Sequence, residues 1–107
     1  MIYYRHNQEG ENIMKHIIEQ LAKKYNNKNI DYDQISKRLN SYNGKNSFYN
    51  NNYYEFVDGT VIHEAFDEFY EEGRLTLHRF EGKEYNGEYV GYTDRDNILH
   101  FTDVENT

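Results

Sequence analysis

The sequence has no cysteine, no proline and no tryptophan. Without cysteine the chain has no disulfide, no thiolate nucleophile and no thiolate metal ligand. Mean hydropathy is low, at -1.12, and no apolar run approaches the ~20 residues of a membrane-spanning helix. The first residues do not have the pattern of a secretory signal. We therefore expect no membrane association and a cytoplasmic location, which the lack of cysteine also fits.

Aromatic residues supply what the sequence lacks in aliphatic content, with 12 Tyr and 6 Phe among 107 residues. Aromatic side chains bury a large apolar area each, and a chain of this length forms one modest core. We expect a single folded domain over residues 1–107. Abundant Asn, Lys, Tyr and Ile without proline indicate an AT-rich coding sequence, and hence a low-GC bacterium, its phage or a mobile element.

Charge is divided unevenly along the chain. Residues 1–54 hold eight basic and five acidic side chains, whereas residues 55–107 hold four basic and fourteen acidic ones. The whole chain carries a formal net charge of -7. An asymmetry of this size favours a charged partner or a steering field, although plain solubility explains an acidic domain equally well.

Helical periodicity is strongest over residues 12–25, where apolar side chains recur on one half of the helix surface. A second helix is predicted from Asp31 or Asp33 to Tyr42, with Asn43-Gly44 as its end. A polar, Asn-rich connection over residues 43–53 follows. A third helix is predicted over residues 58–72, with Gly73 after its last turn.

The remaining segments read as strands over residues 74–80, 88–93 and 98–104. Asn86-Gly87 and residues 94–97 have the composition of turns between them. Residues 1–5 and 53–57 could add further strands. The expected fold class is α+β: about three helices on one face of a small antiparallel sheet that ends in a three-stranded meander.

The segment EAFDEFYEEG, residues 64–73, places five carboxylates on one face of the third predicted helix. On that helix Phe66, Phe69 and Tyr70 would face the core. Like charges four residues apart, and acids at a helix C-terminus, cost together about 1–2 kcal/mol. A feature that lowers stability without local need is a candidate functional site. Arg74, Arg79 or the basic N-terminal half could neutralise these carboxylates within the fold; otherwise a basic partner would.

Catalytic and metal-binding patterns are weak. His63 and Asp67 would lie one turn apart on a helix, as in zinc sites, but a third ligand is needed. Asp94 and Asp96 open like a calcium loop, yet its glycine position is occupied by Leu99. No nucleophile elbow or phosphate-binding loop is present. We expect no enzyme activity, no metal, no cofactor and no small-molecule substrate.

The acidic segment 64–73 and the acid-rich stretch from Glu81 to Asp103 resemble, in character, the small phage-encoded anti-CRISPR and anti-restriction proteins. This likeness covers about half of the chain and involves no family motif. It implies an inhibitor that presents a DNA-mimic-like acidic surface to a basic protein, such as a nucleic-acid-binding effector or host-defence nuclease, in a bacterial cytoplasm. The expected partner-binding residues are Glu64, Asp67, Glu68, Glu71, Glu72, Glu81, Glu84, Glu88, Asp94 and Asp96, with Tyr49, Tyr53 and Tyr54 as aromatic contacts.

Two other protein classes fit the same sequence. Immunity proteins and antitoxins that neutralise a toxin share the acidic profile. A small regulator could instead bind nucleic-acid phosphates directly through bases of the N-terminal half, including Lys37 and Arg38. The segment DQISKRLN invites a helix-turn-helix reading, but the residues after it favour a loop rather than a recognition helix. Direct nucleic-acid binding is therefore the weaker alternative.

Overall fold

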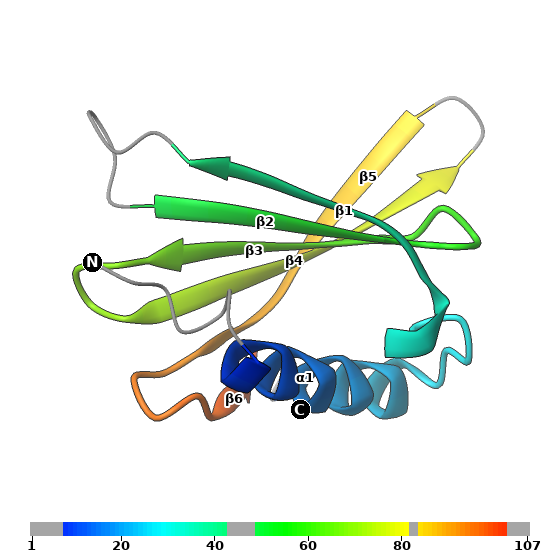
Figure 1. Cartoon of the computed structure of the whole chain (residues 1–107). Helices are drawn as coiled ribbons and strands as arrows, with labels where there is room; N and C mark the ends of the chain where they lie inside the picture. The colour runs from blue at the N-terminus through cyan, green and yellow to red at the C-terminus, as the bar shows by residue number, and fades with distance from the viewer. Residues whose placement is uncertain (1–7, 43–48, 82–83, 103–107) are drawn as a thin grey trace.

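The computed structural model describes residues 8–42, 49–81 and 84–102, in which one α-helix packs against a six-stranded antiparallel sheet (Figure 1). The strands follow one another in space in their order along the chain, each paired with the next. The elements are α1 (Gln8–Tyr25), η2 (Tyr32–Gln34), β1 (Ile35–Tyr42), β2 (Tyr49–Phe56), β3 (Val61–Asp67), β4 (Glu72–Glu81), β5 (Glu84–Thr93) and β6 (Leu99–Phe101).

The first predicted helix is confirmed as α1, which begins four residues earlier than the periodicity indicated. Its apolar stripe buries Met14, Ile17, Ile18 and Leu21 completely. Lys23 and Lys24 lie in its last turn, where the helix dipole favours cations. Within the described ranges, no helix is both long and apolar enough to cross a membrane.

Alternate residues of the strands form the rest of the core, on the face of the sheet that α1 covers (Figure 1). Tyr54 and Phe56 come from β2, and Ile62 comes from β3. Strands β4, β5 and β6 contribute Leu75, Leu77, Val90 and Leu99 to the same cluster. Because side chains alternate along a strand, the intervening residues lie on the opposite face of the sheet, which we call the open face.

The face toward α1 also holds a buried polar group beside the apolar core. The Asn40 side-chain amide donates to Asn52 Oδ1 over 2.7 Å, and Asn52 Nδ2 donates to Glu64 Oε1 over 3.1 Å. Glu64 is completely buried, and Asn52 nearly so. A buried carboxylate is tolerated only where donors compensate its lost hydration. Glu64 is therefore part of the interior and not of an exposed acidic surface.

The second predicted helix is wrong: its segment forms the short helix η2 and then β1. Asp31, one of the two residues predicted to cap that helix, instead caps η2 by accepting from the Asp33 amide over 2.9 Å. Ile35 and Leu39 are four residues apart, a spacing that fits one side of a helix. In β1, however, a register shift between Ile35 and Lys37 leaves Ile35 against the core and Leu39 exposed opposite Tyr53 on the open face. Pairing of β1 along β2 decides between helix and strand.

The third predicted helix is also wrong, and with it the prediction of three helices on a sheet. Residues 58–72 form the end of one turn, all of β3, the β3–β4 turn and the start of β4. Ile62 and Phe66 are again spaced by four, so the apolar pattern fitted both periods. The positive φ of Glu71, 59°, closes the turn and is incompatible with a continuing α-helix.

Strand predictions in the C-terminal half were mostly correct. Residues 74–80 lie within β4 and residues 88–93 within β5, and residues 94–97 form the turn before a shorter β6. The turn predicted at Asn86-Gly87 is wrong, because both residues pair within β5. A Cβ on Gly87 would lie 2.7 Å from the His78 ring, so the glycine accommodates that ring rather than a turn.

Further upstream, β2 starts at Tyr49, inside the stretch predicted as a loop, and includes most of the suspected strand at 53–57. The suspected strand at residues 1–5 lies outside the described residues.

Candidate functional site

Residues 67–72, which are acidic and aromatic, close the hairpin between β3 and β4. We call these residues the hairpin tip. Asp67 Oδ1 accepts hydrogen bonds from the amides of Phe69, over 2.8 Å, and Tyr70, over 3.1 Å. This closes the turn with the side chains of Phe69 and Tyr70 outside the core. Phe69 is 64% and Tyr70 60% exposed, and their rings meet edge to face at 4.9 Å.

Carboxylates flank these two rings along the chain. Asp67 and Glu72 are direct cross-strand partners at the end of the hairpin, and Glu68 and Glu71 lie in the turn between them. Like charges directly opposite each other in a sheet are unfavourable. Burial raises the pKa of the Glu68 carboxyl above its ordinary value. The tip thus keeps four of the five carboxylates predicted as a group, in a turn instead of along a helix.

The open face is hollowed beside the hairpin tip. Six side chains of β2, β3, β4 and β5 line a depression of about 320 Å³: Tyr49, Asp67, Glu72, Arg74, Tyr89 and Tyr92. Register explains the grouping, because Tyr49 pairs with Asp67, Asp67 with Glu72, and Arg74 with Tyr92. Cross-strand partners point to the same face of a sheet. We call this depression the hollow.

Arg74 lies in the hollow without forming an ion pair there. Its guanidinium carbon is 4.6 Å from the centre of the Tyr89 ring, a cation–π contact. Among the residues that the structure describes, Arg74 is not ion-paired with Asp67 or Glu72. The side chain of Arg79, the other candidate for neutralising the acidic segment, lies outside the described part. The hollow therefore carries two carboxylates and one guanidinium that do not pair.

A row of rings continues along the open face from the hollow. His63 stacks on Tyr53 at 4.4 Å, and its Nε2 donates a 2.9 Å hydrogen bond to Asn51 Oδ1. The His78 ring lies 6.2 Å from that of His63. Burial, and then the neighbouring His78, lower the pKa of His63, and burial lowers the pKa of His78. Both imidazoles are therefore held neutral at pH 7.

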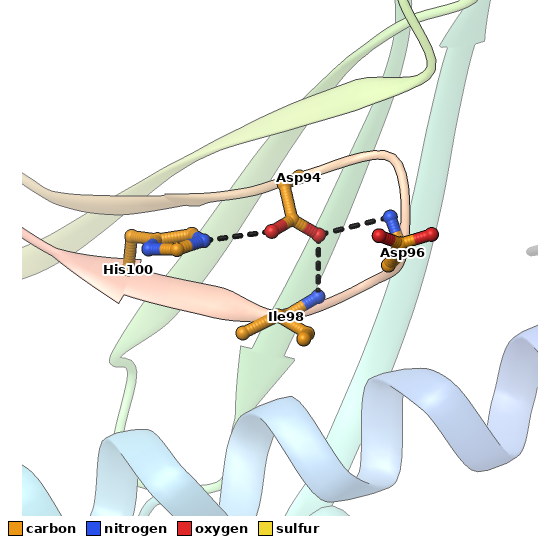
Figure 2. A network of polar contacts seen from close by, with 4 residues as sticks. All are labelled: Asp94, Asp96, Ile98 and His100. Carbon is orange, nitrogen blue, oxygen red and sulfur yellow. Dashed lines mark hydrogen bonds and ion pairs between the residues drawn. The ribbon is translucent and has the colours of Figure 1, made fainter.

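Asp94 organises the turn between β5 and β6 (Figure 2). Its Oδ1 accepts from the amides of Asp96 and Ile98, over 2.9 and 3.0 Å, and its Oδ2 lies 2.8 Å from His100 Nε2. The hydrogen bond with His100, reinforced by the backbone donors, lowers the pKa of Asp94. Asp94, predicted as a partner contact, thus holds the turn from which it would have to reach a partner.

The other residues predicted as partner contacts are scattered. Tyr54 is buried in the core beneath Arg38, whereas Tyr53 lies on the open face. Glu88 and Asp96 are exposed, Glu88 opposite Leu77 along the sheet and Asp96 in the β5–β6 turn. The side chains of Glu81 and Glu84 lie outside the described residues.

Sequence reasoning missed five residues of the site: Phe69 and Tyr70 of the tip, and Arg74, Tyr89 and Tyr92 of the hollow. Strand alternation over 72–77, with Leu75 and Leu77 inward, would have placed Arg74 beside Glu72 on the open face.

The suspected metal pair does not form a chelate. His63 and Asp67 lie on one strand, where four residues span about 13 Å, whereas on a helix they would have been one turn apart. Within the described residues, no group of three His, Asp or Glu side chains could hold a metal ion.

Comparison with protein-family models, with curated proteins and with solved structures finds no match for this chain. Its function therefore has to be argued from the tip and the hollow themselves.

Proposed function

We propose that this protein is a protein-binding inhibitor that docks its hairpin tip and the adjoining hollow onto a basic surface of a target protein. The observation that carries the proposal is the pair of exposed rings, Phe69 and Tyr70, set among carboxylates at the end of a hairpin. A target that binds nucleic acid through a groove of lysines and arginines has the complementary chemistry.

Exposed aromatic rings at the tip supply the contact area. Large apolar side chains exposed together at a protrusion are typical of interaction sites, and aromatic residues dominate the binding energy of many interfaces. The turn is held by two hydrogen bonds to Asp67, so little backbone order remains to be imposed on binding.

Carboxylates at the tip select the partner. Asp67 and Glu72 oppose each other without an ion pair to Arg74, and the whole chain carries a net charge of -7. A basic surface would relieve their repulsion, attract the protein over long range and speed association. Only the negative charge of the tip is proposed to attract the target. The carboxylates do not lie along a helix and Glu64 is buried, so they do not reproduce the regular spacing of DNA phosphates.

A matched pair of variants tests this function. The tip variant combines Phe69→Ser, Tyr70→Ser and Glu72→Lys; the control, Asp33→Lys, makes the same change of charge in η2, at the opposite end of the molecule (Figure 1). Wild type, tip variant and control are each immobilised, and proteins captured from a bacterial lysate at low and at high salt are quantified. A captured protein is then purified, and displacement of labelled nucleic acid from it is measured.

We expect wild type and the control to retain a target at low salt, and the tip variant to lose it. Wild type should also displace nucleic acid from this target. Equal retention by the tip variant would rule out the tip as the binding surface. A retained target whose nucleic-acid binding is unchanged would rule out inhibition by competition.

A further inference from the structure

We propose that two copies of this chain pair along β1, antiparallel and centred on Leu39, to form a dimer with one continuous sheet. β1 lies at one end of the strand order (Figure 1), so among the described residues β2 alone pairs with it. Leu39 is 53% exposed in the middle of this edge strand. An edge strand offers backbone donors and acceptors to a strand of another chain.

The backbone of Asn40 is directed to the outer edge of β1. Phe56, in β2, donates its amide hydrogen to the Thr60 carbonyl on the β3 side over 2.8 Å. Amides alternate in direction along a strand, so the amide of Tyr53 points the other way, toward β1. Tyr53 is the partner of Leu39, which places the backbone bonds of Leu39 on the β2 side. The N–H and C=O of Asn40, the next residue, therefore face outward.

Centring the pair on Leu39 gives the register that best fits the side chains. Leu39 then lies opposite Leu39 of the second copy in a non-hydrogen-bonded pair, where side chains approach most closely. The two exposed leucines cover each other on the open face. Asn40 of each copy lies opposite Arg38 of the other, so the outward backbone groups of Asn40 meet a strand.

Charge is compatible with a second copy in this register. Lys37 of each copy lies opposite Ser41 of the other, and the two Lys37 residues are offset by four residues, or about 13 Å. That separation exceeds the Debye length of about 8 Å at physiological salt. Within its own chain, Lys37 faces the opposite charge of Glu55 on β2. A register centred on Arg38 would instead set two guanidinium side chains opposite each other.

The pairing is limited in length and leaves the hairpin tip exposed. The register shift between Ile35 and Lys37 disrupts the start of β1, which confines pairing to the residues after it. One short strand covers less than the roughly 1,200–2,000 Å² of stable complexes, so the dimer should depend on concentration. The tip lies at the end of the sheet where β1 ends. Antiparallel pairing therefore sends the two tips to opposite ends, and dimerisation is independent of the proposed function.

Two cysteine variants of the full-length protein test the register, because the chain has no cysteine of its own. Leu39→Cys should form an intermolecular disulfide under mild oxidation, since Cα atoms of a non-hydrogen-bonded pair lie about 4.5 Å apart. Lys37→Cys is the matched control on the same strand and the same face, with its mate about 13 Å away. Non-reducing electrophoresis should show Leu39→Cys cross-linking at least about tenfold faster.

Sedimentation velocity tests the association itself. Wild type should form a dimer as its concentration rises from about 10 µM to about 1 mM. Leu39→Lys sets like charges opposite each other and should weaken association at least about tenfold. Ile98→Lys makes the same kind of change at a residue that is 56% exposed in the β5–β6 turn, and it should leave association unchanged.

Three results would overturn the dimer. They are a wild type that stays monomeric at every concentration, equal cross-linking rates for Leu39→Cys and Lys37→Cys, and equal weakening by Leu39→Lys and Ile98→Lys. Circular dichroism checks that each variant is folded. If Leu39→Lys does not fold, the two cysteine variants decide, because cysteine is smaller than leucine and adds no charge.

Discussion

Asp67 and Glu72 face each other directly across the open end of the β3–β4 hairpin. Replacing Glu72 with lysine turns a repulsive cross-strand pair into an attractive one. We expect Glu72→Lys to raise the free energy of unfolding by about 0.5 kcal/mol, measured by urea denaturation, while weakening binding to a basic target. A gain in stability with a loss of binding is the signature of a functional feature that the fold does not need.

Salt provides the control for this stability change. The gain should shrink at 1 M salt, where interactions between exposed charges are largely screened. Asp33→Lys makes the same change of charge away from the hairpin and should leave stability within about 0.5 kcal/mol of wild type. If Glu72→Lys destabilises the protein, the two carboxylates do not repel each other in the folded state.

Truncation of Phe56 should lower the free energy of unfolding far more than truncation of Phe69. Phe56 is 1% exposed and belongs to the core, so Phe56→Ala is expected to cost about 3–5 kcal/mol. Phe69 is 64% exposed, and Phe69→Ala should change stability by less than about 0.5 kcal/mol. Thermal or urea unfolding of the two variants compares them. A large loss of stability for Phe69→Ala would mean that the Phe69 ring packs in the core, as the third predicted helix required.

Buried polar side chains next to Gly73 leave no room for a Cβ at this position. A Cβ at this position would lie 2.8 Å from Thr93 Oγ1 and 3.2 Å from Glu64 Oε2. We expect Gly73→Ala to cost about 1–3 kcal/mol through overpacking. Adding Thr93→Ala removes the nearer atom, so the double variant should be more stable than the sum of the two single effects. Simple additivity in urea denaturation would show that Thr93 is not the obstacle.

Acidification should destabilise the protein in two steps. His63 and His78 have pKa values lowered from their ordinary 6.5, so the unfolded chain binds their protons first. Stability is then lost as pH falls below about 6.5. Asp94 has a pKa lowered from 3.8, and the stability that it contributes is lost only below that pH. Between pH 7 and 5, the variant His63→Gln with His78→Gln should show a flatter stability profile than wild type; an equal slope would contradict this account.

The spacing of apolar residues correctly predicted the helices and strands in which it fits only one kind of secondary structure. In α1 the apolar positions fit only a helix, and Leu75 and Leu77 of β4 fit only a strand. Between these, the spacing of Ile62 and Phe66 satisfies both periods, and the spacing of Ile35 and Leu39 fits a helix although the two residues face opposite sides of β1. For those segments the choice rests on pairing with distant strands, and a single sequence does not record such pairing.

The site was predictable in its residue types and not in its arrangement. Acidic side chains of residues 64–72 stood out because they would lower the stability of a helix that does not form, and Asp67 and Glu72 nevertheless lie in the site. Register, however, decides that Glu64 is buried while Tyr49 and Tyr92 join the hollow. A shift of one residue in a strand would reverse each of these positions.

Hydroxyl-radical footprinting of the side chains, free and in complex with a captured target, tests the central claim most directly. Phe69 and Tyr70 at the tip, with Tyr49 and Tyr92 of the hollow, should lose reactivity in the complex. Val57, which is 60% exposed and whose amide donates to Gln34 of η2 at the other end of the sheet, should react as before. Protection of Val57 with unchanged reactivity of Phe69 and Tyr70 would contradict the account.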